Sequence, residues 1–205
     1  MAVRISTFVL LLQISLIACA ATEEAVDAAG ARAAVIDAWQ QGQHTVWAIE
    51  WAAMPSGGPV TVETWRVNNR YRFEILEAGA PAMIGETLIF DGQRAWQYNH
   101  FTVTSPKTVA TPWLSPISDV LVIVEQLLAQ TPQAVSRTPV GISSGPAQKL
   151  RFQFAEEKIL TVWLDDQMGL PVRLHLKTDR GEITMTARSY EPLIAPPAGL
   201  FEPTN

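Results

Sequence analysis

The sequence predicts a mainly β protein in which a wide, curved antiparallel sheet is accompanied by two helices. Most of the chain alternates apolar and polar residues with a period of two, which is typical of half-buried strands. Short turn sequences separate successive strands, so we expect meander connections and antiparallel pairing. Only two segments show helical spacing, and a sheet of about ten strands should twist and curl towards a barrel.

The N-terminal residues have the features of an export signal. Arg4 supplies a short positive region, and residues 8–17 form an apolar stretch interrupted by Gln13 and Ser15. This stretch is too short to span a bilayer permanently, so it predicts a removable signal peptide over residues 1–18.

Cys19 follows the apolar stretch directly and is the only cysteine in the chain. Residues 16–19 (Leu-Ile-Ala-Cys) resemble the lipobox of bacterial lipoproteins, whose cysteine is acylated with fatty acids such as palmitate and becomes the new N-terminus. Because each buried methylene contributes about 0.8 kcal/mol, two or more chains anchor a protein firmly to a membrane. Residues 18–20 (Ala-Cys-Ala) also satisfy the rule for ordinary signal peptidase, which would remove the cysteine.

Residues 19–205 are enough for one domain with a sizeable core, and no linker divides them. The net charge is −5 and only 17% of residues are charged. This composition argues against a surface for nucleic acid or for anionic membranes, which requires clustered Lys and Arg. We therefore expect a single exported domain outside the cytoplasm, attached to a membrane through Cys19.

The first expected element after the signal is a helix over residues 23–41. Thr22 is the expected cap, Glu23 and Glu24 suit the first turn, and Gly42 lies just beyond the end. The period then changes to two. The strands expected in the first half cover residues 46–51, 60–67, 71–75, 86–90 and 94–99, with a short strand over 101–104.

The second half begins with a helix over residues 119–129, capped by Ser118 or Asp119. Its residues 120–124 are apolar on all sides, so we expect it to be largely buried. The strands expected after it cover residues 134–140, 149–154, 159–164, 172–177 and 183–187.

Catalytic and metal-binding sets are not apparent in the sequence. His44, His100 and His175 have no Cys, His or carboxylate at metal-ligand spacing. The carboxylate pairs at residues 156–157 and 165–166 fall in turns, where we expect them to be exposed and to serve turn geometry. We therefore expect neither an enzyme nor a cofactor.

The apolar faces of the clearest strands should lie together on the concave side of the curved sheet, with the two helices as their cover. An apolar concavity under a thin, alanine-rich cover leaves room for an apolar ligand. The alternative is that the same side chains fill the space as an ordinary core. The candidate cavity residues are Trp39, Trp47, Trp51, Phe73, Ile75, Phe152, Phe154, Leu174 and Met185.

Several short segments resemble the outer-membrane lipoprotein-sorting proteins of the LolA/LolB type. They are residues 65–67 and 71–74 (Trp-Arg-Val and Tyr-Arg-Phe-Glu), 90–98 (Phe-Asp-Gly-Gln-Arg-Ala-Trp-Gln-Tyr), 162–165 (Val-Trp-Leu-Asp), 168–173 (Met-Gly-Leu-Pro-Val-Arg) and the C-terminal stretch 197–203. The resemblance implies an incomplete antiparallel β-barrel with helices covering an apolar cavity.

For function, the resemblance implies an anchored envelope protein that binds or transfers a lipid or the acyl chains of a lipoprotein. Related domains act as sensors for envelope-stress regulators. The alternative function is therefore a sensory or protein-interaction domain on the same scaffold, with no lipid cargo. The resemblance brings no catalytic residues with it.

Overall fold

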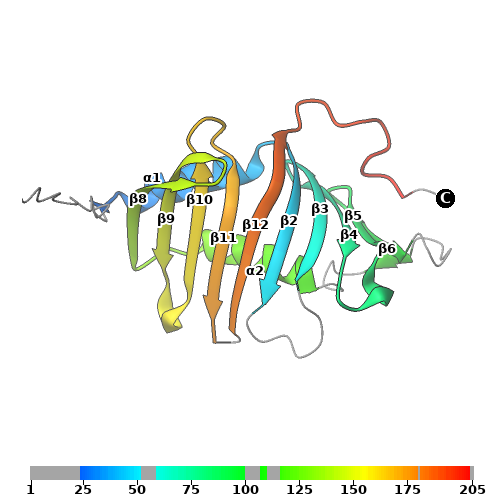
Figure 1. Ribbon diagram of the computed structural model, residues 1–205, viewed down its shortest axis with the longest axis horizontal. Helices are drawn as coiled ribbons and strands as arrows, with labels where there is room; N and C mark the ends of the chain where they lie inside the picture. Colours follow the sequence, from blue (N-terminus) through cyan, green and yellow to red (C-terminus); the bar gives the residue numbers. More distant parts are fainter. Residues whose placement is uncertain (1–23, 52–58, 100–106, 110–115, 180, 204–205) are drawn as a thin grey trace, which may run out of the picture.

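The computed structural model describes residues 24–51, 59–99, 107–109, 116–179 and 181–203 (Figure 1). The expected signal peptide, Cys19 and the short strand expected over residues 101–104 lie outside the described residues, as does the side chain of Trp51. Within the described part, no helix is both long enough and apolar enough to cross a membrane.

Twelve antiparallel strands of the described chain form one sheet in the order β1-β8-β9-β10-β11-β12-β2-β3-β4-β5-β6-β7. In chain order the strands are β1 (Glu24–Ala25), β2 (Gln43–Trp51), β3 (Val60–Val67), β4 (Arg70–Glu77), β5 (Glu86–Phe90), β6 (Ala95–Asn99), β7 (Lys107–Val109), β8 (Ala134–Ile142), β9 (Gly145–Gln153), β10 (Ile159–Asp165), β11 (Pro171–Thr178) and β12 (Gly181–Pro192). The last strand pairs with β2, so the two halves of the chain join in the middle of the sheet (Figure 1).

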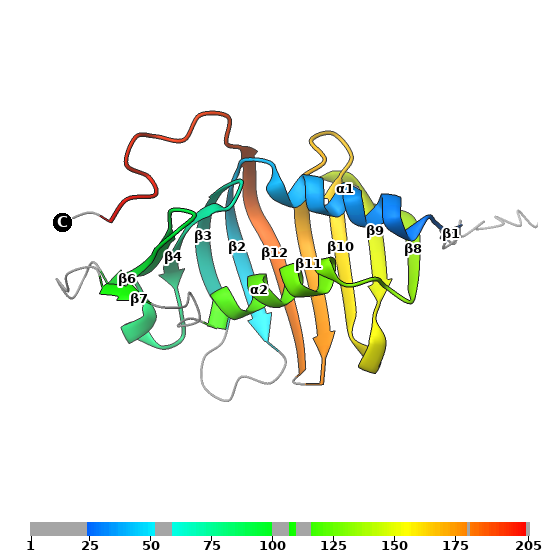
Figure 2. The same ribbon diagram turned by 180° about the vertical axis from the view of Figure 1, so that it is seen from behind.

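The two helices, α1 (Ala28–Gln40) and α2 (Pro116–Ala129), lie on the same face of this open, curved sheet (Figure 2). The expected fold class, an incomplete curved antiparallel barrel with two helices over its concave face, is confirmed.

The first helix begins later than the sequence predicted. Glu24 and Ala25 pair with β8 instead of forming a helical turn. The N-cap is Asp27, whose carboxylate accepts hydrogen bonds from the backbone N–H of Ala29 at 3.2 Å and of Gly30 at 2.8 Å. An aspartate that satisfies two N–H groups of the first turn is a strong helix start, and it fixes the boundary here.

The second helix begins at Pro116, earlier than predicted, where the missing N–H of proline has no helical partner to lose. Val120 and Val124 are buried as expected, with exposed fractions of 2% and 0%. Glu125 and Gln126 are exposed, so the helix buries one face against the sheet instead of its whole circumference.

The core follows the period-two pattern across six neighbouring strands. One row of directly paired residues runs through Leu150, Val162, Leu174, Met185, Ile49 and Val60. All six belong to a single buried cluster together with Val35 of α1 and Val124 of α2. Because side chains alternate between faces of a strand, this register places every row member on the helix-covered face.

A smaller apolar cluster lies on the opposite face of the sheet, beneath the C-terminal segment. Phe201 packs there against Ile89 and Tyr98, with its ring 5.0 Å from the guanidinium carbon of Arg70. Phe201 thus brings the segment after β12 onto the β5–β6 part of the convex face. Both views show this segment running from the end of β12 towards the β5–β6 end of the sheet (Figures 1 and 2).

Candidate functional site

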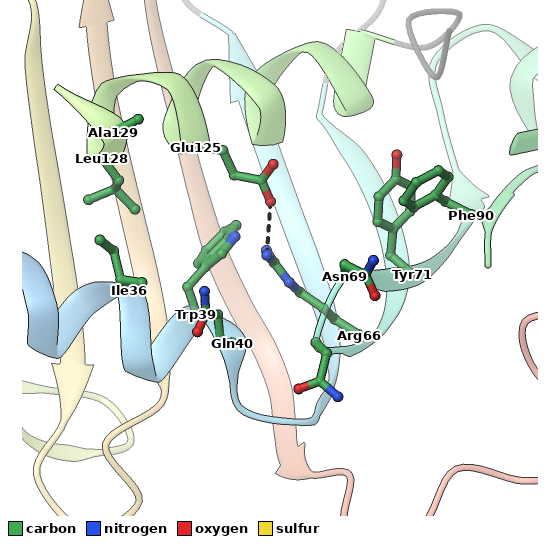
Figure 3. Close-up of a pocket in the computed structure, with 11 residues that line it drawn as sticks. Ile36, Trp39, Gln40, Arg66, Asn69, Tyr71, Phe90, Glu125, Leu128 and Ala129 are labelled. Atoms are coloured by element: carbon green, nitrogen blue, oxygen red, sulfur yellow. Dashed lines mark hydrogen bonds and ion pairs between the residues drawn. The ribbon is translucent and has the colours of Figure 1, made fainter. Parts of the chain in front are cut away.

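A pocket of about 700 Å³ opens between the two helices and the strands β3, β4 and β5 (Figure 3). Its apolar lining includes Ile36 from α1, Leu128 and Ala129 from α2, and Phe90 from β5. The turn between β3 and β4 contributes asparagines at residues 68–69. The pocket therefore lies at one end of the concave face, where both covering helices meet the sheet.

Arg66 is the charged residue of β3 that points into this pocket. The register places it opposite Gln43 on β2 and Tyr71 on β4, on the same face as the apolar core. Its Nη2 donates a hydrogen bond of 2.8 Å to Oε1 of Glu125 on α2, and its guanidinium carbon lies 4.9 Å from the ring centre of Trp39 on α1. One side chain thus connects the sheet to both helices (Figure 3).

Burial lowers the pKa of Arg66, while the Glu125 carboxylate acts in the opposite direction. The guanidinium nevertheless stays charged at any physiological pH, since the ordinary pKa of an arginine lies far above neutrality. The two side chains therefore form an ion pair without net charge at the pocket. The Arg66 side chain is 16% exposed and that of Glu125 is 50% exposed, so the pair lies at the border between the pocket and solvent.

Tyr71 supplies a neutral phenol beside this pair. Burial raises its pKa to about 12, and the negative charge of Glu125 adds to that effect. The ring packs against Phe73 at 4.8 Å and against Phe90 at 5.1 Å between centres. The rings of Tyr71 and Phe90 therefore form an aromatic side of the pocket, beside the Arg66–Glu125 ion pair.

Two buried donors at the pocket have no hydrogen-bond partner among the residues that the structure describes. They are the indole Nε1–H of Trp39 and the Nε–H of Arg66. Trp39 is only 5% exposed, so solvent does not readily compensate its N–H. Buried polar groups without a partner are uncommon in folded proteins.

The structure places most of the predicted cavity residues in the packed core and not at this pocket. Eight of the nine candidates are described, and all eight belong to one buried cluster with exposed fractions of 8% or less. Among these, Trp39 also lines the pocket. A ligand role for the other seven is still a prediction, and they already fill the space between sheet and helices.

Sequence reasoning did not single out Arg66, Glu125 or Phe90 as site residues. The position of Arg66 in its strand could have indicated that it faces inward. It lies an even number of residues from Val60 and Val62, on the strand face that is directed towards the core. Glu125 could not be found this way, since its partner lies 59 residues earlier in the chain.

The sequence also suggested that the histidines stand alone, which is wrong for His44. Its Nε2 lies 2.7 Å from Oε1 of Glu63, and its Nδ1 lies 2.9 Å from Oε1 of Glu191. The ring stacks on Trp65 at 5.1 Å between centres. This cluster is on the convex face, away from the pocket. His175 has a long contact of 3.4 Å to Glu182, and His100 lies outside the described residues.

Asp165 differs from expectation in its burial. It is 4% exposed, whereas the sequence predicted an exposed turn carboxylate. Its Oδ1 accepts the backbone N–H groups of Gln167 and Met168, and its Oδ2 accepts the hydroxyl of Tyr190 at 2.9 Å. The predicted turn role is therefore correct.

In the described part of the chain, no group of three or more His, Cys, Asp or Glu residues is arranged to hold a metal ion.

Known structures that resemble the chain share its fold at low sequence identity. A conserved protein from Thermus thermophilus matches with a TM-score of 0.58 and 10% identity, over 87% of this chain and 94% of that one. A chain of the Pseudomonas aeruginosa MucA/MucB complex matches with a TM-score of 0.53 and 17% identity, over 87% of this chain. The match spans only 62% of that chain's length.

A LolA superfamily protein from Nitrosomonas europaea matches with a TM-score of 0.43 and 12% identity, over 86% of this chain and 98% of that one. An open antiparallel sheet with two helices on its concave face is also what the sequence resemblance implied. The observed fold thus agrees with that resemblance. No protein-family model and no curated protein matches the sequence itself.

Proposed function

We propose that this LolA-like chain is a membrane-anchored envelope lipoprotein that binds the acyl chain of a lipid or of an acylated lipoprotein. In this proposal residues 1–18 are removed on export, Cys19 carries the lipid anchor, and residues 19–205 form the binding domain outside the cytoplasm. The role is binding or transfer, without catalysis.

The observation that carries the proposal is the pocket between α1, α2 and β3–β5. Its volume of about 700 Å³ falls inside the range of about 300–1,000 Å³ that is common for small-molecule sites. Ile36, Phe90 and Leu128 supply apolar walls, and the hydrophobic effect over these walls favours an acyl chain. A few polar groups at the same place can fix the orientation of a headgroup.

Lipid extraction from the purified protein tests this proposal. We expect acyl lipids to co-purify with the wild type and to be detected by mass spectrometry. Ala129 is exposed on α2 and lines the pocket, so Ala129→Trp should block it with little effect on the core. The matched control is Ala33→Trp on the exposed side of α1.

The co-purified lipid should fall several-fold in Ala129→Trp and should be unchanged in Ala33→Trp. Wild-type protein without any bound lipid, or equal lipid in both variants, would contradict the proposal.

A second candidate is a protein-interaction or sensory domain on the same scaffold. It is favoured by the packed centre of the concave face and by the match to a chain crystallised in the MucA/MucB complex. The extraction experiment separates the two, since an interaction domain should retain no lipid in the pocket.

A further inference from the structure

At the polar end of the pocket, two buried hydrogen-bond donors have no acceptor within the described part of the chain. Trp39 Nε1–H and Arg66 Nε–H are both buried, and both side chains line the pocket. The guanidinium carbon of Arg66 lies 4.9 Å from the centre of the Trp39 ring, and the indole nitrogen is on the side of the ring towards Arg66 (Figure 3). An acceptor oxygen that reaches this contact would supply the hydrogen-bond partner that these donors lack.

The charge at this place decides which acceptor fits. Glu125 already neutralises Arg66 through the 2.8 Å hydrogen bond, so the two donors are available without a net positive charge. A free carboxylate would add an unpaired negative charge to a largely apolar pocket, next to Glu125. Burying such a charge is costly unless it is paired, whereas a neutral carbonyl requires only hydrogen bonds.

We infer that the pocket recognises an acyl chain through the carbonyl oxygen of an ester or amide, and that it discriminates against the free fatty acid. This inference rests on the proposed lipid-binding function and names the chemical class of the ligand. The carbonyl accepts from Trp39 and Arg66, while the chain extends along Ile36 and Leu128.

Calorimetric titration of the purified full chain with two ligands tests this inference. Monopalmitoylglycerol presents a neutral ester, and palmitate presents a carboxylate on the same chain; both are titrated above neutral pH, where palmitate is ionised. We expect monopalmitoylglycerol to bind about tenfold more tightly than palmitate.

Two variants locate the preference in these side chains. Trp39→Phe keeps the aromatic ring and removes the N–H. The affinity for monopalmitoylglycerol should therefore fall by about 2- to 10-fold, which is the usual effect of losing one hydrogen bond. Glu125→Gln removes the negative charge, so the affinity for palmitate should rise. The preference for monopalmitoylglycerol over palmitate should then disappear. The control is Trp163→Phe on the convex face, between Lys149 and Arg173, which should change neither affinity.

The outcomes distinguish recognition of the carbonyl from lipid binding itself. Equal or tighter binding of palmitate by the wild type, or unchanged monopalmitoylglycerol binding by a folded Trp39→Phe, would overturn the carbonyl inference and leave lipid binding intact. Because Glu125 is half exposed, Glu125→Gln should fold normally and provides an independent test: unchanged selectivity would also overturn the inference. Failure of both ligands to bind the wild type would overturn the proposed function itself.

Discussion

Arg66 on β3 and Glu125 on α2 form a hydrogen-bonded ion pair of 2.8 Å that joins the sheet to its covering helix. The same guanidinium lies over the ring of Trp39 on α1, so one side chain of the sheet contacts both helices. Because Arg66 is mostly buried and Glu125 is half exposed, the two partners should contribute unequally to stability.

The first prediction concerns this pair. Glu125→Gln should reduce the free energy of unfolding by about 0.2–1 kcal/mol, as double-mutant cycles typically find for partly exposed pairs. Arg66→Ala should cost about 2 kcal/mol, since it also removes packing and the cation–π contact with Trp39. Urea denaturation of both variants and of the double variant measures the coupling between them. A coupling energy of zero would contradict the assigned ion pair.

A second prediction follows from His44 on the convex face. Burial lowers the pKa of this ring, but hydrogen bonds and charge attraction from Glu191 and Glu63 outweigh it, so the pKa is raised above 6.5. A raised folded-state pKa stabilises the protein below pH 6.5, and that contribution disappears as the pH rises through the folded pKa.

The comparison of the wild type with His44→Gln isolates this effect. The wild type should be more stable below pH 6.5 by about 0.5 kcal/mol after allowance for solvent screening, and the difference should shrink towards alkaline pH. A difference that grows as the pH rises would show that the sign is wrong.

The third prediction tests the packed centre of the concave face. Phe152 is 0% exposed and Leu174 is 1% exposed, both inside the main buried cluster. Phe152→Ala should therefore cost about 3–5 kcal/mol, and Leu174→Trp should cost about 1–3 kcal/mol through overpacking. Thermal or urea unfolding measures both. Tolerance of both changes would indicate an open cavity at the centre instead of a core.

A fourth prediction concerns the membrane anchor. Cys19→Ser should move the protein from the membrane fraction to the soluble fraction and abolish labelling with a palmitate probe. Fractionation and N-terminal sequencing measure this. A mature wild-type N-terminus at Ala21 would show that ordinary signal peptidase removes the cysteine.

The period-two pattern predicted most of the sheet, because each strand buries one face and its apolar residues mark that face. The same rule could have placed Arg66 inside, since it shares the phase of Val60 and Val62. The predicted start of α1 was wrong, because Glu24 pairs with β8 and Asp27 caps the helix, and both features compete with the helix propensity of the preceding residues. The partners of His44 and the Arg66–Glu125 pair were not predictable, since they arise from strands and helices far apart in the chain.

In the proposed function, an acyl chain occupies the pocket between α1, α2 and β3–β5. Photo-crosslinking with a palmitoyl ester that carries a diazirine on its chain, followed by peptide mapping, tests it most directly. We predict labelling in the helical peptides that contain Ile36 and Leu128, and loss of that labelling in Ala129→Trp. Labelling confined to the convex face, around Trp163 or Phe201, would contradict the account.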